Sequence, residues 1–419
     1  MVGLPIAQAI KVYMDLSILS PASQAEAEAL MKEIGVDPGG LEIMSPKTVL
    51  VLARINKLSV FAANILKQET LSLGADTAVS RNALSGKAKW TDCLVIGNLA
   101  HIKRLCEKLK KQPYGLSRVA GELESALINY QRNDFVLNLN RDKLNLNSHT
   151  HIMGIINITP DSFSGDGLLR KTCDVRRATC DVVEYAQKLV AEGADILDIG
   201  GESSRPGARP VSLKAELERV IPALKAIRKK IRIPISIDTY KSEVARQALD
   251  NGADIINDIT ALHADLRMAK VVKRYKAAVV LMHMQGKPPT MQKNPGYGAV
   301  MEEIITYLGS AIKKALDNGI DLEKIILDPG IGFGKRPEHN LKIIKSLKQL
   351  KVLGRPILIG ASRKSFIAAA GGGPLSERVS ATIGSNALAV VNGAKILRVH
   401  DVKEAKMAFS VIDRILQCQ

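Results

Sequence analysis

Short apolar runs alternate with longer amphipathic segments through most of this chain. Eight of the runs have the length and aliphatic content of buried strands, and each of them ends in polar residues. They span residues 151–159, 194–203, 234–239, 254–260, 277–285, 325–330, 356–362 and 393–401. The segments between them carry apolar residues at helical spacing, most clearly over 213–231 and 300–316. Eight strand-then-helix units predict an α/β fold, a (β/α)8 TIM barrel, whose functional side chains lie at the carboxyl ends of the strands.

The residues before this repeat carry a different pattern. Helices are expected over residues 22–34, 58–71, 101–111 and 116–131, and short strands over residues 11–17, 49–53 and 93–97. This mixture predicts a small α/β domain at residues 1–133, preceding a barrel domain at residues 134–419. Alternating apolar and polar residues over 135–146 predict a hairpin that closes the amino-terminal mouth of the barrel. The small domain carries no recognisable set of catalytic side chains, so we expect the function in the barrel.

Composition agrees with a folded chain of two domains and narrows the range of partners. The 419 residues are 46% hydrophobic, which is enough for a sizeable core. The net charge of +17 would attract anions, including phosphates or nucleic acid. The lysines are nevertheless scattered along the helices, and no platform of arginine and aromatic residues for bases accompanies them. We therefore expect small-molecule substrates and no nucleic acid.

Cysteine usage and hydropathy indicate where the protein works. The five cysteines form no CxxC pair, and their odd number favours free thiols over a disulfide framework or a zinc site. Gln8 and Lys11 interrupt the apolar residues at the amino terminus, which also lacks the basic lead of a signal peptide. No apolar run reaches the length of a membrane span. We expect a reduced, cytoplasmic protein with no membrane partner.

Acidic and amide residues follow three of the predicted strands. Asp238, Asn257 and Asp328 each come directly after aliphatic residues, which places them at the mouth of the barrel. Each of them alone is equally well explained as a polar residue that caps a loop. Together they suit a nitrogen-rich ring, because a carboxylate accepts two parallel N–H bonds from an amino-pyrimidine edge. Buried carboxylates without partners would be costly, which favours the binding interpretation.

Cationic residues follow the last two strands. Lys364 comes after the seventh strand, and Arg398 and His400 close the eighth strand on one of its faces. In barrels of this kind these strand ends form the usual phosphate site, where cations can neutralise a leaving pyrophosphate. The alternative is a structural salt bridge for Arg398 and a core position for His400. That alternative does not explain the cations after the seventh strand.

The first two strands end in features that suit a phosphate-bearing substrate. Asn157 could hold Mg²⁺ together with phosphate oxygens and waters, since Mg²⁺ favours few protein ligands. A turn-forming asparagine is the alternative. Two connections rich in Gly, Pro and Ser follow, at residues 160–170 and 203–212. They are either long turns or loops that close over a substrate and exclude water, and their adjacent placement favours the second interpretation.

Six segments, in order along the chain, resemble the signature motifs of dihydropteroate synthase. They are residues 154–164 (Gly-Ile-Ile-Asn-Ile-Thr-Pro-Asp-Ser-Phe-Ser), 198–207, 282–295, 328–335, 362–365 and 398–401. The resemblance covers residues 134–419. It implies a transferase of folate biosynthesis that condenses 6-hydroxymethyl-7,8-dihydropterin diphosphate with p-aminobenzoate, releasing pyrophosphate and 7,8-dihydropteroate. It also implies a homodimer that pairs through helices at one end of the barrel.

The same resemblance implies a role for each candidate residue. Those that would hold the pterin or line its pocket are Asp238, Asn257, Asp328, Lys364, Met282 and Phe333. Those that would bind the diphosphate and Mg²⁺ are Asn157, Arg398 and His400. Ser204, Arg205 and Ser365 would shape the p-aminobenzoate site. The residues expected to act in catalysis are Asp166, Lys364, Arg398 and His400.

This chain departs from the family pattern at two loop positions and in its length. It reads Ser162-Phe-Ser-Gly-Asp-Gly where the family commonly reads Ser-Phe-Ser-Asp-Gly-Gly, so the loop acid is expected one residue later, at Asp166. Ser204 stands where threonine is common, which removes a methyl group and keeps the hydroxyl. Residues 1–133 have no counterpart in the compact members of the family. An assembly module and a regulatory module are both open for them.

Two other functions share part of this pattern. A pterin-binding methyltransferase with a corrinoid partner would use the same strand-end carboxylates and amide. It would not need the cations after strands seven and eight, or the two long loops. A non-catalytic pterin-binding protein would bind the ring tightly without turnover. The six ordered motifs favour the synthase over both.

Overall fold

The computed structural model of the chain describes residues 17–21, 23–158, 175–203, 210–287, 289–374 and 377–418. These residues form two compact units, of which the first ends at Ser125 and the second runs from Ala126 to Cys418. Helix α6 (Leu116–Gln131) runs through this boundary. The domain limit at residue 133 therefore stays a prediction, and each unit is described by itself below.

The first unit is a small antiparallel sheet with helices. Its described elements are α1 (Gln24–Glu33), α2 (Pro38–Met44), η2 (Ser45–Thr48), β1 (Leu50–Ser59), α3 (Val60–Leu71), β2 (Asp76–Val79), α4 (Arg81–Leu84), β3 (Trp90–Asn98) and α5 (Leu99–Leu109). The described strands have the order β1-β3-β2, and α3 and α5 both pack against β3, where Cys93 and Val95 are buried. The helices expected here are present, and the expected strands 49–53 and 93–97 lie within β1 and β3. The strand expected at 11–17 falls almost wholly outside the described residues.

The boundary between β1 and α3 shows how local chemistry sets an element. The sequence predicted a helix from residue 58, whereas β1 continues to Ser59 and the helix starts at Val60. Ser59 is the N-cap, because its Oγ accepts a hydrogen bond from the amide of Ala62 at 3.2 Å. A serine cap of this kind contributes about 1 kcal/mol.

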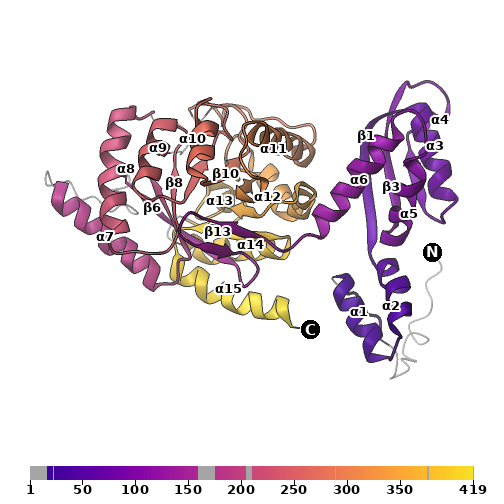
Figure 1. The fold of residues 1–419 in the computed structure, drawn as a ribbon, viewed down its shortest axis with the longest axis horizontal. Helices are drawn as coiled ribbons and strands as arrows, with labels where there is room; N and C mark the ends of the chain where they lie inside the picture. The colour runs from indigo at the N-terminus through magenta and orange to yellow at the C-terminus, as the bar shows by residue number, and fades with distance from the viewer. Residues whose placement is uncertain are drawn as a thin grey trace. The chain divides into compact units, whose positions relative to one another are not determined.

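The second unit is a closed parallel barrel, which confirms the (β/α)8 prediction (Figure 1). Its described strands are β6 (His151–Asn157), β7 (Ile196–Gly200), β8 (Ile235–Asp238), β9 (Ile255–Asp258), β10 (Ala278–Met282), β11 (Ile325–Asp328), β12 (Ile357–Ile359) and β13 (Ala394–Val399). They pair in sequence order, and β13 closes the barrel on β6. Aliphatic residues fill these strands because both of their faces are covered.

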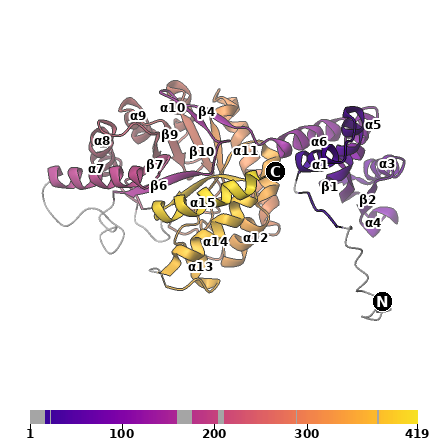
Figure 2. The same cartoon turned by 90° about the horizontal axis from the view of Figure 1, so that it is seen from below.

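Helices surround the strands of the barrel (Figures 1 and 2). They are α7 (Val175–Ala191), α8 (Leu213–Arg228), α9 (Ser242–Asp250), α10 (Met268–Tyr275), α11 (Val300–Asp317), η4 (Leu322–Lys324), α12 (Pro337–Lys345), η5 (Leu347–Leu353), α13 (Ser365–Ala369), α14 (Arg378–Val391) and α15 (Val402–Gln417). Their apolar faces and the outward residues of the strands form one continuous buried core. Among the described helices, none combines the length and the apolar character needed to cross a membrane.

A hairpin closes the amino-terminal mouth of the barrel, as the sequence predicted. Strands β4 (Val136–Asn138) and β5 (Lys143–Asn145) pair in antiparallel fashion. Leu137 and Leu146 are buried against inward-facing strand residues such as Met153. Burying each leucine is worth roughly 1.5–3 kcal/mol, which fixes the plug at this end. The carboxyl end of the barrel is left for polar side chains.

Candidate active site

One arginine joins carboxylates from two different strands at the carboxyl end of the barrel. Arg398, near the end of β13, donates from Nε to Asp198 Oδ2 at 2.6 Å and from Nη2 to Asp238 Oδ2 at 3.0 Å. Asn257, from β9, donates from Nδ2 to the same Asp198 oxygen at 3.2 Å. The side chain of Asp198 is 0% exposed and that of Asp238 is 11% exposed. The barrel thus collects a cation, two carboxylates and an amide in one buried cluster.

Asp198 is the member of this cluster that sequence reasoning missed. It sits within β7, where the aliphatic run Ile196-Leu-Asp-Ile199 indicated only a buried strand. Its Oδ1 has no hydrogen-bond partner among the described residues, although it is fully buried. An uncompensated buried carboxylate oxygen costs free energy unless a donor reaches it. A charged residue inside an otherwise aliphatic strand is the signal that could have identified it.

Burial and neighbouring charges shift the pKa values of Asp238 and Arg398 in this cluster. Burial raises the pKa of Asp238 to about 7, against the opposing effect of Arg398 and with a further rise from Asp198. For Arg398, burial alone would lower the pKa, but the carboxylates of Asp198 and Asp238 raise it overall. The guanidinium therefore stays charged, while Asp238 titrates in the physiological range.

A second pair of opposite charges lies beside this cluster. Burial raises the pKa of Asp328, which ends β11, and the nearby Lys364 opposes that rise. Burial in turn lowers the pKa of Lys364 to about 8, with Asp328 pulling it up and Arg398 pushing it down. Asp328 Oδ1 accepts a hydrogen bond from the amide of Gly330 at 2.7 Å, which fixes the carboxylate.

Lys364 is held in place by its own short contacts. Its Nζ lies 4.5 Å from the ring centroid of Phe333 and donates to the carbonyl of Ile331. Gly332 makes this approach possible. A Cβ at Gly332 would lie 2.9 Å from Lys364 Cδ, and its φ of +80° is in the region that favours glycine. The conformation of this loop therefore depends on that glycine.

An apolar wall stands next to the charged groups. Met282, Phe333, Ile259 and Met291 form a small buried cluster of their own, separate from the main core. Met282 ends β10 and Phe333 lies in the loop after β11. Apolar side chains beside a few convergent polar groups are the usual composition of a small-molecule site.

His400, which the sequence predicted, and Arg363, which it did not single out, make different contacts. His400 follows β13, and its Nδ1 lies 3.1 Å from Ser362 Oγ, which ties the two strand ends together. Arg363 pairs with both oxygens of Asp401, at 3.0 Å and 2.5 Å, and so serves the structure of the loop. Ser365 is exposed at the first position of α13.

Asn157 is the residue whose amide oxygen the sequence predicted as a ligand for Mg²⁺. It ends β6, and a Cβ placed at Gly200 on the neighbouring strand would lie 3.6 Å from both Asn157 Oδ1 and Asp238 Cβ. The amide oxygen therefore faces the carboxylate cluster. Among the described residues, no group of three or more His, Cys, Asp or Glu side chains could form a metal cage. The donor set fits Mg²⁺ held by a single protein oxygen with substrate phosphates and waters.

A charged network at the rim was not apparent from the sequence. Lys241 donates to both Glu202 and Glu216, and Glu216 also accepts from Thr239 Oγ1 at 2.6 Å. Tyr240 OH donates to Glu202 at 3.0 Å. Glu202, Glu216, Thr239 and Tyr240 line a narrow cavity of about 20 Å³ together with Asp238. They come from separate elements of the chain, so no local motif indicates them.

Lys335 is a further residue that the sequence did not single out for function. It is buried, and its Nζ lies 2.9 Å from His283 Nδ1 and 3.1 Å from the carbonyl of Phe333. Burial lowers its pKa to about 7. The lysine ties the loop that carries Phe333 to the end of β10, and so it positions the apolar wall.

Three predicted site residues lie outside the described part of the chain. They are Asp166, Ser204 and Arg205. They belong to the segments that follow β6 and β7, and the last residues of these strands, Asn157 and Gly200, lie beside Asp238. The structure brings together Asp238, Asn257, Asp328, Lys364 and Arg398, which are the predicted residues at five other strand ends.

Comparison with known proteins identifies the family. The model of the pterin binding enzyme family matches residues 153–400. A dihydropteroate synthase from Synechocystis sp. is 44% identical over 267 residues, which cover 64% of this chain and 90% of that protein. The solved structure of Xanthomonas albilineans dihydropteroate synthase with 4-aminobenzoic acid has a TM-score of 0.62 at 37% identity, covering 68% of this chain and 100% of that one.

A longer relative extends the likeness beyond the barrel. A probable bifunctional folylpolyglutamate synthase/dihydropteroate synthase of Halobacterium salinarum is 38% identical over 389 residues. The match covers 93% of this chain and 46% of that protein. The likeness therefore includes much of the first unit, for which the compact relatives have no counterpart.

Proposed function

This chain belongs to the pterin-binding enzyme family and has the activity of a dihydropteroate synthase, and we propose which residues carry that activity. They are those of the cluster around Arg398 at the carboxyl end of the barrel. The enzyme is a transferase of folate biosynthesis, and it condenses 6-hydroxymethyl-7,8-dihydropterin diphosphate with p-aminobenzoate. The observation that carries the site proposal is Arg398 bridging Asp198 and Asp238, beside the Asp328–Lys364 pair.

The pterin ring is assigned to the acidic and amide side of the cluster. We assign Asp238 and Asp328 to accept ring N–H groups, and Asn257 offers both a donor and an acceptor. Met282 and Phe333 supply an apolar wall for the face of the ring. Lys364, whose ammonium group lies over the ring of Phe333, would supply a cation at the edge of the pterin ring. Buried carboxylates discriminate strongly in favour of a ligand with matching donors, because an unmatched ligand would leave them unsatisfied.

The diphosphate is assigned to the cationic side. Arg398 and His400 lie at the end of β13, where barrels commonly bind phosphate. Asn157 would supply the protein oxygen for Mg²⁺, with the other positions filled by phosphate oxygens and waters. When bound, Mg²⁺ would help to neutralise the charge that develops on the departing diphosphate.

The chemistry breaks the bond between the pterin methylene carbon and the diphosphate oxygen. The bonding electrons leave with pyrophosphate, so cations beside that oxygen lower the barrier. The methylene carbon becomes cationic and is attacked by the amine of p-aminobenzoate, which then loses a proton. Asp166 is assigned to support the cation, and Ser204, Arg205 and Ser365 are assigned to hold p-aminobenzoate. The two loops would exclude water, which would otherwise consume the cation.

The reaction is tested by omitting each component in turn. Purified full-length protein is mixed with Mg²⁺, the dihydropterin diphosphate and p-aminobenzoate, and pyrophosphate and dihydropteroate are measured together. We expect both products to appear in equal amounts and only when both substrates are present. Binding of the pterin with no turnover in the complete mixture would instead support a binding protein or a methyltransferase.

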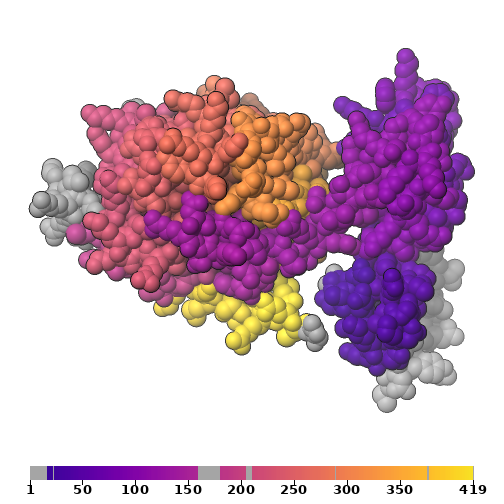
Figure 3. All heavy atoms as spheres, viewed as in Figure 1, coloured from indigo at the N-terminus to yellow at the C-terminus, as the bar shows by residue number. Residues whose placement is uncertain are grey.

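A homodimer is proposed from the surface of the last two helices. Helices α14 and α15 pack side by side (Figure 2), and yellow carboxyl-terminal atoms are exposed on the face that Figure 3 shows. Both helices carry exposed apolar side chains. They are Leu388, Val391, Met407, Val411, Ile415 and Leu416. Exposed apolar side chains on neighbouring helices often mark a protein interface. Met407→Glu with Val411→Glu should shift the mass measured by sedimentation from dimer to monomer, and an unchanged mass would reject this face.

A reducing, cytoplasmic compartment is also proposed. Cys93, Cys106, Cys180 and Cys418 are unpaired, and Cys173 lies outside the described residues. Free thiols persist where glutathione and thioredoxin keep them reduced.

A further inference from the structure

A cavity of about 290 Å³ lies at the opposite end of the barrel from the active-site cluster. Its walls include Lys395 at the start of β13, whereas Arg398 lies near the end of the same strand. Thr150, just before β6, and the carboxyl-terminal residues of α14 and α15 complete it. All of its lining residues belong to the second unit. The proposed synthase activity makes no use of this cavity.

Three lysines line this cavity with little to balance their charge. The side-chain ammonium groups of Lys348 and Lys395 form no hydrogen bond or ion pair with another described residue. The Nζ of Lys351 donates to the neutral amide oxygen of Asn133 at 2.9 Å and lies 5.4 Å from the ring centroid of Tyr130. The positive charges therefore face the cavity without a carboxylate in contact.

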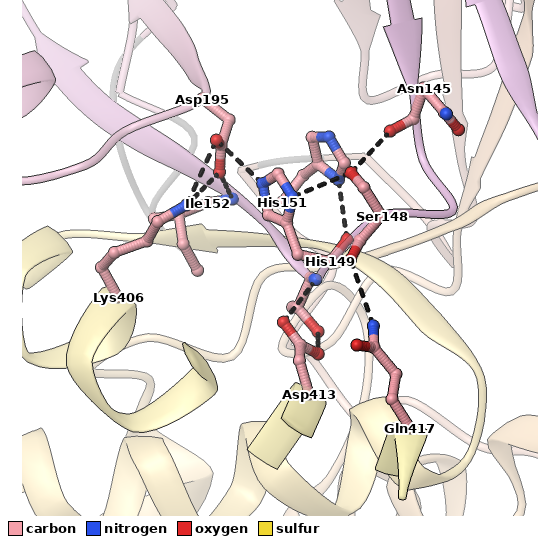
Figure 4. Close-up of polar contacts among 10 residues, drawn as sticks. Asn145, Ser148, His149, His151, Ile152, Asp195, Lys406, Asp413 and Gln417 are labelled. Atoms are coloured by element: carbon pink, nitrogen blue, oxygen red, sulfur yellow. Dashed lines mark hydrogen bonds and ion pairs between the residues drawn. The ribbon is translucent and has the colours of Figure 1, made fainter. Parts of the chain in front are cut away.

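The carboxylate in the lining is already committed elsewhere. Asp413 is the single acidic residue among the described lining residues, and it accepts from the amide and the hydroxyl of Thr150 at 2.7 Å and 2.6 Å (Figure 4). Gln417 donates to the carbonyl of Ser148 at 3.1 Å on the same side (Figure 4). These bonds fix the wall between β6 and α15 and leave the lysines as the unmatched groups.

The lysines also oppose one another. Burial lowers the pKa of Lys351, and the charges of Lys395 and Lys348 lower it further. Burial lowers the pKa of Lys395 as well, although Asp134 and Asp413 pull in the other direction. An anion between them would replace this repulsion with attraction.

We propose that this cavity binds a small multivalent oxyanion carrying phosphate or carboxylate groups. Lysine ammonium groups are common phosphate and carboxylate partners, acting as point charges with rotatable donors. The amide groups of Asn133, Asn147 and Gln417 supply neutral polar atoms in the same wall. A competing explanation is that the lysines offset the negative ends of α14 and α15, which finish at this cavity. That explanation requires no ligand.

Calorimetric titration of the full-length protein separates the two explanations. Inorganic triphosphate and citrate serve as the probes for phosphate and carboxylate groups. The test variant is Lys351→Gln with Lys395→Gln, and the control is Lys342→Gln with Lys345→Gln on exposed positions of α12. Both variants remove the same charge. Lys364→Ala identifies any binding that belongs to the active-site cluster.

Of the two charge-matched double variants, only Lys351→Gln with Lys395→Gln should lose anion binding at the cavity. We expect at least one probe to bind the wild type and the control equally, and at least tenfold more weakly to the test variant. The probe that binds tighter identifies the chemical class. The proposal would be overturned if the probes bound equally to the wild type, the test variant and the control, or if the control weakened binding as much as the test variant. It would also be overturned if Lys364→Ala removed all of the binding.

A second variant covers the case in which the double variant fails to fold. Asn147→Asp keeps the oxygen that accepts from the amide of Phe135 at 2.8 Å and adds a negative charge to the cavity wall. It should weaken the same binding at least tenfold. Unchanged affinity in Asn147→Asp, or a lower melting temperature in the lysine variant with unchanged anion affinity, would favour the helix-end explanation and contradict the site.

Discussion

Arg398 and Asp198 are 200 residues apart in the chain, yet the Nε of Arg398 donates to Asp198 Oδ2 at 2.6 Å. Strand β6 lies between their two strands in the barrel, so this bond spans the mouth. The same arginine reaches Asp238 at 3.0 Å. One cation therefore organises the two carboxylates, and the geometry of the proposed substrate site depends on it.

Breaking this pair should be costly to the fold. Arg398→Gln leaves the buried carboxylates of Asp198 and Asp238 without their cation, and Asp198→Asn leaves Arg398 with Asp238 as its remaining carboxylate partner. We expect Arg398→Gln to lower the free energy of unfolding by about 3 kcal/mol and Asp198→Asn to lower it by less. The double variant should lose less than the sum, because the two changes remove the same interaction. Urea unfolding of the four proteins measures this coupling. Fully additive losses would show that the ion pair contributes nothing of its own.

The pH dependence of turnover should be narrow. Asp238, with a pKa of about 7, must be ionised to accept ring N–H groups, and Lys364, with a pKa of about 8, must be protonated. Activity should therefore rise as pH passes 7 and fall as pH passes 8. Lys364→Arg should move only the alkaline limb upward, because arginine stays protonated. A flat kcat/KM between pH 6 and 9 would contradict both assignments.

Lys335 should make the free energy of unfolding rise with pH above neutrality. Its folded-state pKa is about 7, whereas a lysine in the unfolded chain titrates near 10.4. Between these values the unfolded state binds more protons, so this group makes stability rise with pH. Lys335→Met should flatten that rise, and Lys342→Met on an exposed position of α12 should not. Urea unfolding at pH 7, 8 and 9 tests this, and equal slopes in all three proteins would refute it.

The strand ends were predictable because their signal is local. Asp238, Asn257 and Asp328 each interrupt an aliphatic run, and the barrel topology brings such interruptions to one mouth. Asp198 was hidden because it lies within a strand and finds its partner only across the barrel. The Glu202–Lys241–Glu216 network was hidden for the same reason, since its members come from separate elements.

The first unit shows the other limit of sequence reasoning. Strand β2 spans only Asp76–Val79, which is too short to display an alternating pattern. Helix α2 contains Gly39 and Gly40, and glycine disfavours helices, so the pattern there predicted none. Assembly and regulation are both open as roles for this unit, and no contact among its described residues favours either of them.

Pterin recognition by Asp238 is testable by binding alone. Asp238→Asn replaces one acceptor oxygen with an NH₂ donor. One N–H group of the pterin ring would then lose its acceptor and face another hydrogen-bond donor. We expect pterin affinity to fall by about 2–3 kcal/mol, which is roughly 30- to 150-fold. Asp317→Asn, an exposed change on α11, is the matched control and should bind normally. Unchanged affinity in Asp238→Asn would remove this residue from the site.

The central claim is that one cluster holds the pterin on its carboxylate side and the diphosphate on its cationic side. The most direct test compares Arg398→Ala with the wild type in two measurements, binding of the bare dihydropterin and turnover of its diphosphate. Loss of the guanidinium should reduce diphosphate turnover at least tenfold more than it reduces binding of the bare pterin. Equal losses in the two measurements would contradict the assignment of Arg398 to the diphosphate.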